Sequence, residues 1–469
     1  MNGRTQDKRL VLLFALARTV FCGYRAAIQS ITTDEAFSYN DFISGNWSHI
    51  YARYDANNHV LYSILAKLSV SAFGTSEFTL RLPSVAAGFF LTMGIYAILA
   101  ATIESRLVRW FAIFALGLNP LILDLSVAAR GYSLSLALLA WAMYFFLRQR
   151  DLISGLFLGL SISANLTILY PAVGLVTCPV LLRSGDIEKR IQASLTLAFT
   201  ALGVFGGICY ESLSKATPAN FYAGRGNPAS ALMTLVDSSV RGSERAGPLG
   251  SYIAAIWIEY LIVPSLLVFI AAIAIRTFLS KPERRAALAP ALALGAALAG
   301  LIAAHYVVDL PYPVDRLGVY LVLLFGLAWA IAISEAGLLV AQAASGLLAG
   351  LLIVQLVMQL QVRYFRIWPY DLPAKDIALR LREETRGRPP YSVKIGATWF
   401  QVPALEFYRR VYGLTALQPI QRYDQTPLEG FDYYVLNRKD DESIRGRNLE
   451  RLNPISSEPI STVLLAKEP

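Results

Sequence analysis

The apolar residues of this chain gather into runs close to the ~20 residues that an α-helix needs to cross a bilayer. Hydrophobic residues make up 55% of the 469 residues and charged residues only 16%, which is unlike an ordinary soluble protein. Nine runs stand out, at residues 10–30, 85–103, 110–125, 134–147, 191–210, 252–275, 286–308, 317–334 and 337–360. A further stretch, 152–182, is long enough for two short spans broken near Tyr170-Pro171. We therefore expect a polytopic α-helical membrane protein with about eleven transmembrane helices.

The basic residues lie in the short turns between these runs, and such loops favour the cytoplasmic side. Arg4, Lys8 and Arg9 precede the first run, and Arg106, Arg148, Arg183, Lys281 and Arg284 mark later turns. The sequence thus predicts a multi-pass protein of the plasma (inner) membrane, with a cytoplasmic N-terminus and a periplasmic or extracellular C-terminal domain. The net charge of +9 follows from this topology. Because the basic residues are dispersed between spans, a nucleic-acid partner is not expected.

Two domains are expected. Residues 1–360 form the transmembrane catalytic domain, in which residues 31–81 are a long first outer loop with amphipathic helices. Residues 361–469 are richer in proline and charge, and they predict a small outer-facing α/β domain. There "AKDIALRLREETRG" and "PALEFYRRVYGL" have helical spacing, and "YSVKIGATWF" and "FDYYVLN" are typical of strands. Three cysteines inside apolar runs indicate buried small residues and no disulfide framework.

The first outer loop opens with adjacent carboxylates, Asp34 and Glu35, in "TTDEAFS". Thr32 and Glu35 have the spacing of a capping box, which starts a helix. Apolar residues after it predict an amphipathic helix along the membrane surface. A capping box explains Glu35 but does not need Asp34, so local sequence leaves open whether the pair starts a helix or carries chemistry.

A second polar cluster, "DANNHVLY", contains Asp55, Asn57, Asn58 and His59 just before an apolar run. His59 is a candidate ligand for a phosphate or a sugar, and an ordinary helix start explains the cluster equally well. Arg81 in "FTLRLPS" is a further candidate, although an arginine there could also snorkel to the headgroups.

Outer-facing arginines form a third group of candidates. Arg130 and Tyr132 stand in "AARGYSLSLALL", Arg225 in "NFYAGRGNP", and Asp315 and Arg316 in "DLPYPVDRLGVY". The positive-inside rule disfavours outer arginines without a function, although an ion pair between Asp315 and a neighbour would also account for that site. Arginines facing carboxylates suit a substrate that combines an anionic phosphate with a hydroxyl to be deprotonated.

Other chemistries lack their motifs. The sequence contains no G-x-x-x-x-G-K-[ST] loop, no G-x-G-x-x-G fingerprint and no H-E-x-x-H, so a nucleotide cradle or a zinc-protease site is not expected.

The order of these features resembles the GT-C superfamily of integral-membrane glycosyltransferases. The resemblance is densest from residue 31 to 147, in the order "DEA", "GNW", "NNHVLY", "FGTSEFTLRLPSVAAG" and "AARGYSLSLALL". It is strongest for the bacterial branch related to protein O-mannosyltransferases and lipid A aminoarabinose transferases. The resemblance implies the GT-C fold and an inverting transfer of a sugar from a polyprenyl-phosphate donor to an acceptor hydroxyl on the outer face.

The resemblance also implies roles for particular residues. Asp34 is expected to act as general base, with Glu35 supporting the helix start or binding the acceptor. Related transferases often have Lys-Pro-Pro or His-Pro-Pro where this chain has Asn57-Asn58-His59, so His59 has either a cationic or a hydrogen-bonding role. Arg130 and Arg316, with Tyr132 nearby, are expected to contact the donor phosphate. The acceptor is a lipid, a glycan or a protein, and a divalent cation (Mg²⁺ or Mn²⁺) is a possible cofactor because metal dependence varies across the superfamily.

Two alternatives remain open from sequence. A transporter or flippase of lipid-linked saccharides would also combine arginines and carboxylates in a helical bundle, but it should have ionisable residues near mid-membrane and broken helices in two matching halves. A non-catalytic relative that binds a partner is disfavoured by the intact Asp34.

Overall fold

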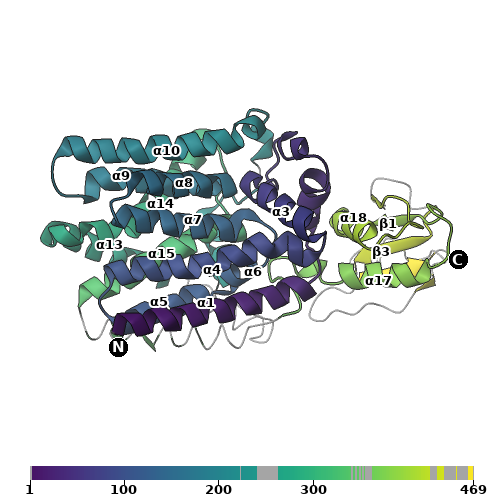
Figure 1. Ribbon diagram of the computed structural model, residues 1–469, viewed down its shortest axis with the longest axis horizontal. Coiled ribbons are helices and arrows are strands. Elements are labelled where there is room, and N and C mark those ends of the chain that lie inside the picture. The colour runs from purple at the N-terminus through teal and green to yellow at the C-terminus, as the bar shows by residue number, and fades with distance from the viewer. Residues whose placement is uncertain are drawn as a thin grey trace. The chain divides into compact units, whose positions relative to one another are not determined.

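Figure 1 shows a computed structural model of the chain. It describes residues 3–221, 223–239, 262–337, 362–422, 430–437, 450–451 and 463–467, with a few isolated positions between 339 and 353. The chain divides into two compact units. The first comprises Met1–Gly23, Arg53–Tyr62 and Leu82–Leu360, and the second comprises Tyr24–Ala52, Ser63–Arg81 and Gln361–Pro469.

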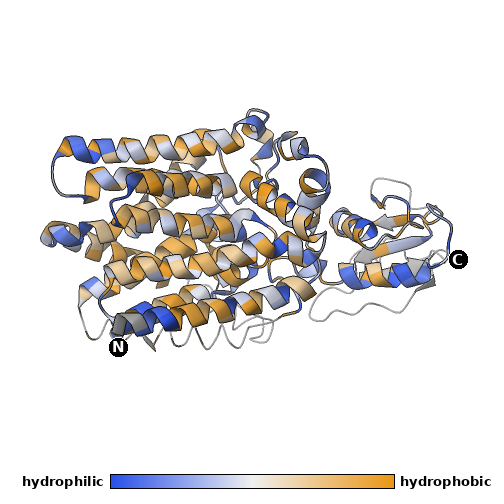
Figure 2. Ribbon diagram, in the orientation of Figure 1, coloured by the Kyte–Doolittle hydropathy of each residue, from blue (hydrophilic) through white to orange (hydrophobic). Residues whose placement is uncertain are grey.

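The first unit is helical. Its helices are most of α1 (Gly3–Ile28) and α4 (Glu77–Thr102), then α5 (Arg106–Gly117), α6 (Pro120–Leu125), α7 (Gly131–Leu147), α8 (Asp151–Ala164), α9 (Leu169–Leu182), α10 (Ile187–Leu213), α11 (Pro228–Ser239), α13 (Val263–Ser280), α14 (Ala289–Val308) and α15 (Val319–Ala336). Apolar residues dominate α7, α8, α9 and α14 (Figure 2). Helix α8 packs against both α7 and α10. Small residues allow this close approach, because a Cβ at Gly159 would lie 2.5 Å from the Ala201 carbonyl oxygen.

Six helical segments in the described part of the chain are long and apolar enough to cross a membrane: Gln6–Ile28, Glu77–Thr102, Ile187–Leu213, Val263–Ser280, Pro282–Val308 and Asp315–Ala336. Four shorter apolar helices accompany them, at Val60–Phe73, Gly131–Leu147, Asp151–Ala164 and Leu166–Leu182. The prediction of a multi-pass helical membrane protein is confirmed. The number of about eleven spans stays a prediction, and most of the expected span at 337–360 and the first part of that at 252–275 lie outside the described residues.

Two predicted boundaries differ from the structure. Residues 152–182 do form two short helices, but the break lies at Asn165 rather than at Tyr170-Pro171, because the Asn165 side chain accepts a hydrogen bond from the Thr167 N–H and starts a new turn. The run at 110–125 is likewise two helices. Asn119 caps the second of them and Pro120 occupies its first turn.

The second unit contains a five-stranded sheet in the order β2-β1-β3-β5-β4. The strands are β1 (Ile395–Ala397), β2 (Gln421–Arg422), β3 (Tyr433–Asn437), β4 (Glu450–Arg451) and β5 (Val463–Lys467). Strand β1 pairs in parallel with β2 and β3, and β5 pairs antiparallel with β3 and β4. Helices α17 (Ala374–Glu384) and α18 (Val402–Val411) pack on it through a buried apolar core. The predicted small α/β domain, with both of its helices, is confirmed.

The acidic segment belongs to this second unit. Helix α2 (Thr33–Ser38) continues as a π-helical turn, η1 (Tyr39–Ile43). Tyr39 packs edge-on against Phe407 of α18 at 5.1 Å between ring centroids, and the Asn40 amide donates to the Pro403 carbonyl at 3.0 Å. The apolar stripe expected to lie along the membrane surface is therefore covered by α18, which corrects that prediction. Much of the loop 31–81 thus groups with residues after 361, and the domain boundary at 360 stays a prediction.

The remaining elements of the loop are a short 3₁₀ helix, η2 (Trp47–Tyr51), and helix α3 (Val60–Phe73). The three cysteines are buried and free, as predicted.

Candidate functional site

The start of α2 is the capping box that the sequence predicts. The Thr32 hydroxyl accepts from the Glu35 N–H at 3.2 Å, and the Glu35 carboxylate accepts from the Thr32 N–H at 2.8 Å. These reciprocal bonds satisfy two N–H groups that helix formation leaves without partners.

Glu35 is also paired with Arg81. The guanidinium donates from Nε to one carboxylate oxygen at 2.8 Å and from Nη2 to the other at 2.7 Å. Its three remaining N–H groups reach the carbonyls of Ala26, Gln29 and Ser30 at 3.1, 2.8 and 2.7 Å. All five donors of Arg81 are therefore used within the protein, and both side chains of the pair are 0% exposed. This geometry corrects the prediction that Arg81 contacts substrate, as well as the alternative that it snorkels: Arg81 and Glu35 instead fix the backbone around α2.

Asp34 differs from its neighbour because its side chain is partly exposed. Its Oδ2 accepts a hydrogen bond from the indole Nε1–H of Trp368 at 3.1 Å, and the indole is buried against Phe365. This contact fixes the direction of the carboxylate on a partly exposed residue.

A third carboxyl group, Asp371, lies beside Thr33 at the start of α2, although no motif in the sequence points to it. Its Oδ2 accepts from the Thr33 N–H at 2.9 Å, and its Oδ1 lies 2.6 Å from the Thr33 hydroxyl oxygen. The same hydroxyl also lies within hydrogen-bond reach of the Phe400 carbonyl oxygen. It has a single proton for these two acceptors, and a protonated Asp371 would supply the second.

The electrostatics agree with a protonated Asp371. Burial raises the pKa of this carboxyl well above its ordinary value, and the negative charges of Asp34 and Glu35 raise it further, against the lowering effect of the Thr33 hydrogen bonds. The sequence signal was weak, since "IWPYDLP" is a proline-rich turn some 340 residues from Asp34. The arrangement thus has one ion-paired carboxyl group, one buried carboxyl group with a raised pKa, and one on a partly exposed residue.

Glu77, which the sequence places near the next span, belongs to the same network. It accepts from the Tyr408 hydroxyl at 3.1 Å and pairs with Lys375 at 2.9 Å. The Tyr408 oxygen in turn accepts from the Ile31 N–H at 2.8 Å. Helix α18 therefore helps to position the residues that enter α2.

The first unit contains a second cluster, which begins with a turn at Asp55. The Asp55 side chain accepts from the Asn57 N–H at 2.8 Å, and its carbonyl accepts from the Asn58 N–H at 2.9 Å. These are the bonds of an Asx turn. They favour a structural role for Asp55, whereas Asn58 is buried in the turn that follows.

Arg130, just before α7, is 2% exposed and lies against this turn. It donates to the Asn57 carbonyl at 2.7 Å and to the Asn57 side-chain oxygen at 3.0 Å. Its guanidinium lies 6.0 Å from the ring of Tyr132. The structure thus brings together Asn57, Arg130 and Tyr132.

His59 joins the same cluster. Its Nδ1 lies 2.8 Å from the Ala164 carbonyl oxygen, and its ring packs edge-on against Tyr132 at 4.9 Å. Burial lowers the pKa of His59 well below its ordinary value, and the positive charges of Arg130 and Arg316 lower it further. Both effects favour a neutral imidazole, and therefore the hydrogen-bonding role of His59 over the cationic one.

The other predicted residues of the outer loops are held by backbone and hydroxyl contacts. Asp315 accepts from the Ser238 hydroxyl at 2.8 Å, and its N–H donates to the Thr234 hydroxyl at 2.9 Å, so it ties the start of α15 to α11. Arg225 forms a two-way backbone bridge with Tyr312, at 2.9 and 2.7 Å. Arg316, next to Asp315, is close enough to act on the charge state of His59.

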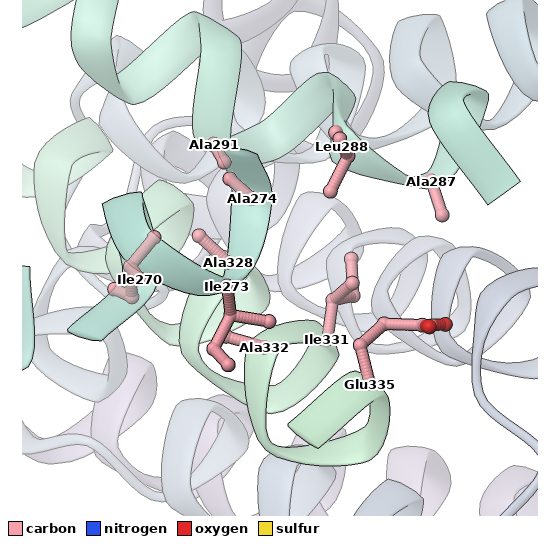
Figure 3. A pocket seen from close by; sticks show the side chains of 10 residues that line it. All are labelled: Ile270, Ile273, Ala274, Ala287, Leu288, Ala291, Ala328, Ile331, Ala332 and Glu335. Carbon is pink, nitrogen blue, oxygen red and sulfur yellow. The ribbon is translucent and has the colours of Figure 1, made fainter. Parts of the chain in front are cut away.

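A cavity in the described part of the chain lies among helices that carry none of these polar clusters. It is lined by residues of α13, α14, α15 and the 3₁₀ helix η7 (Pro282–Leu288). These side chains are apolar except for Glu335 (Figure 3). Glu335 pairs with Lys281 at 2.9 Å. None of the predicted site residues lines this cavity. No three His, Cys, Asp or Glu side chains among the described residues gather as metal ligands, and a divalent cation stays a prediction.

The fold of this chain is similar to that of several solved proteins. No family model and no curated protein matches the sequence. The structure is similar to ArnT from Cupriavidus metallidurans bound to undecaprenyl phosphate, with a TM-score of 0.50 at 15% identity over 98% of each chain. The chain has the GT-C fold.

Two further structures share this GT-C fold. The oligosaccharyltransferase of Archaeoglobus fulgidus aligns with a TM-score of 0.51 at 13% identity, over 92% of this chain and 68% of that one. The arabinofuranosyltransferase AftD from Mycobacteria aligns with a TM-score of 0.50 at 13% identity, and the present chain spans 40% of its length. The resemblance predicted from sequence is thereby confirmed at the level of fold.

Proposed function

We propose that this protein is a membrane glycosyltransferase, in which Asp34 is the general base that deprotonates an acceptor hydroxyl. The donor is a polyprenyl-phosphate sugar, and the acceptor is a lipid, a glycan or a protein. The observation that carries the proposal is the contrast among three carboxyl groups: Glu35 and Asp371 are 0% and 1% exposed, whereas Asp34 is partly exposed. An accessible, oriented carboxylate is what abstraction of a hydroxyl proton requires.

The neighbouring groups support this role for Asp34. The Trp368 N–H fixes the direction of the Asp34 carboxylate, and an acceptor O–H can approach this partly exposed residue. The pair of Glu35 with Arg81 holds the backbone that carries Asp34. The attacking oxygen then reaches the anomeric carbon as its proton moves to Asp34, and the lipid phosphate departs with the bonding electrons.

The departing group is a stable anion and needs cationic stabilisation rather than a strong acid. We assign the phosphate to Arg130 and Arg316, the two arginines whose charges act on His59. Transfer on the outer face, in the inner membrane with a cytoplasmic N-terminus, completes the proposal. Cysteine labelling from either side of sealed membranes would test that orientation.

The transporter alternative has less support. Arg18 is the kind of buried intramembrane charge that a flippase would use, but it donates to the carbonyls of Gly117 and Gly88 at 2.7 and 2.8 Å and to the Ser126 hydroxyl at 2.6 Å. These contacts tie α1 to neighbouring helices and favour a structural role.

The first experiment identifies the reaction. Mass spectrometry of envelope lipids, glycans and proteins, from cells with and without this protein, should reveal one missing sugar mass and its carrier. Asp34→Asn should cause the same loss, because removing a general base typically reduces the rate 10²- to 10⁴-fold. Asp41→Asn changes a second partly exposed aspartate a few residues away and should transfer normally. Normal transfer by a correctly inserted Asp34→Asn protein would refute the assignment.

A further inference from the structure

The histidine of the Arg130 cluster has a fixed protonation pattern. A backbone carbonyl can only accept a hydrogen bond, so the 2.8 Å contact between His59 Nδ1 and the Ala164 oxygen places a proton on Nδ1. Because the ring is neutral, as its lowered pKa indicates, Nε2 has no proton. Nε2 therefore presents a lone pair and acts only as an acceptor.

The surrounding backbone holds this arrangement in place. A Cβ at Gly131 would lie 1.9 Å from the Ala164 carbonyl oxygen and 2.9 Å from His59 Nδ1. Only glycine leaves room there for the carbonyl and the imidazole to meet. On its other side the ring packs edge-on against Tyr132, which is itself 1% exposed. The imidazole is thus clamped between the start of α7 and the end of α8.

The Nε2 atom itself has no partner within the part of the chain that the structure describes, although His59 is only 9% exposed. A buried acceptor without a partner carries a desolvation penalty, and native proteins rarely leave one in place without a reason. A ligand that donates a hydrogen bond at this point would remove the penalty.

The chemistry of the ligand follows from the groups around this atom. An acceptor-only nitrogen is repelled by the unprotonated oxygens of a phosphodiester, which are themselves acceptors, but it binds an O–H group. Arg130 and Arg316, close enough to lower the pKa of His59, favour anionic oxygens. A molecule that satisfies both requirements carries a hydroxyl next to a phosphate.

We propose that His59 Nε2 accepts a hydrogen bond from a sugar hydroxyl of the lipid-linked donor, so that this residue recognises the sugar and not the phosphate. The inference rests on the proposed function for the identity of the donor. In this proposal His59 distinguishes the glycosylated donor from the sugar-free lipid phosphate that remains after transfer.

The test compares binding of undecaprenyl phosphate with binding of its glucosyl, mannosyl and arabinosyl derivatives to purified protein in nanodiscs. Wild-type protein should bind at least one glycosylated lipid more tightly than undecaprenyl phosphate. His59→Asn preserves a donor near the Nδ1 position but lacks an acceptor near Nε2. It should weaken binding of that glycosylated lipid about three- to tenfold, the usual range for one neutral hydrogen bond, and leave undecaprenyl phosphate binding unchanged.

Two further variants control for structure. His59→Gln can place a carbonyl oxygen near the Nε2 position and should recover part of the lost affinity. His305→Asn changes another histidine that bonds a backbone carbonyl, Leu310 at 3.0 Å, and stacks on a tyrosine, and it should change neither Kd. A melting temperature within the range of the controls shows that His59→Asn is folded.

The outcomes separate the two proposals. If His59→Asn weakens binding of undecaprenyl phosphate as much as binding of the glycosylated lipid, or weakens binding of neither, the inference about His59 is overturned. If no glycosylated lipid binds more tightly than undecaprenyl phosphate to the wild type, it is also overturned. If the sugar-dependent loss is observed but envelope analysis finds no transferred sugar, the role of His59 stands and the transferase proposal fails.

Discussion

The acidic start of α2 lies in the second unit, and the cluster of His59 and Arg130 lies in the first. The two differ in whether their buried polar groups have hydrogen-bond partners within the protein. At α2, the five donors of Arg81 and both oxygens of Glu35 are satisfied within the protein. In the cluster, Arg130 is held by neutral oxygens of Asn57, and His59 Nε2 meets no partner among the described residues. A network that is already satisfied holds a backbone in place, whereas one with an unmet acceptor can receive a ligand.

The largest expected effect tests the structural half of this comparison. Arg81→Leu leaves the Glu35 carboxylate and three backbone carbonyls without their donor in a fully buried position. Breaking a buried ion pair by removing one partner typically costs about 3–5 kcal/mol. The variant should therefore show a large drop in unfolding midpoint in detergent, measured by the fluorescence of intrinsic tryptophans.

Arg380→Leu is the matched control, because Arg380 pairs with Glu384 at 2.7 Å on the exposed side of α17 with side chains 43% and 25% exposed. A surface pair of this kind contributes about 0–1 kcal/mol. Equal midpoints for the two leucine variants would show that the buried network is not what holds α2.

The next largest effect tests whether the arginines of the first unit bind the donor phosphate. Arg316→Ala should raise the KM for the polyprenyl-phosphate donor about 10- to 100-fold, since a hydrogen bond to a charged group contributes about 1.5–3 kcal/mol. Steady-state transfer at varied donor concentration measures this change. Arg276→Ala, an exposed arginine of α13, should leave the KM unchanged. A donor dependence identical to wild type in Arg316→Ala would remove that residue from the phosphate site.

The sequence predicts well those features that depend on local periodicity and short-range chemistry. The apolar runs, the Thr32–Glu35 capping box and the two helices of the C-terminal domain are each encoded within a few turns of chain. The break between α8 and α9 lies at Asn165 and not at the nearby proline, because the Asn165 side chain caps the start of a new turn.

Features that join distant segments could not be predicted in this way. The cover that α18 provides for Tyr39, the pairing of Glu35 with Arg81 and the contact of Asp371 with Thr33 connect residues that no period relates. The neutral state of His59 depends likewise on burial and on two arginines far along the chain. Local sequence therefore identified which residues are polar, and tertiary packing decided which of them are satisfied.

A smaller effect is expected at Asp371, where a neutral carboxyl group takes part in the satisfied network. Asp371→Asn can accept from the Thr33 N–H and donate to its hydroxyl, so this variant should keep both stability and transfer close to wild type. Asp371→Ala leaves the Thr33 N–H without its acceptor and should cost about 1–3 kcal/mol. The two unfolding midpoints measure the difference. If asparagine is as damaging as alanine, Asp371 is ionised in the folded protein.

The smallest expected effect is a change in the pH dependence of stability. The folded pKa of Asp371 is raised, so its contribution to stability is fully present below the ordinary pKa of an aspartate and is lost as pH rises towards the folded pKa. Within that window the folded protein retains a proton that the unfolded chain has released, and this changes the free energy of unfolding by at most about 1.4 kcal/mol per pH unit. Unfolding midpoints measured from mildly acidic to neutral pH should therefore fall more steeply for the wild type than for Asp371→Asn. Since asparagine does not titrate, equal slopes would mean that Asp371 carries no proton in the folded state, and that the negative charge next to Asp34 is balanced by other groups.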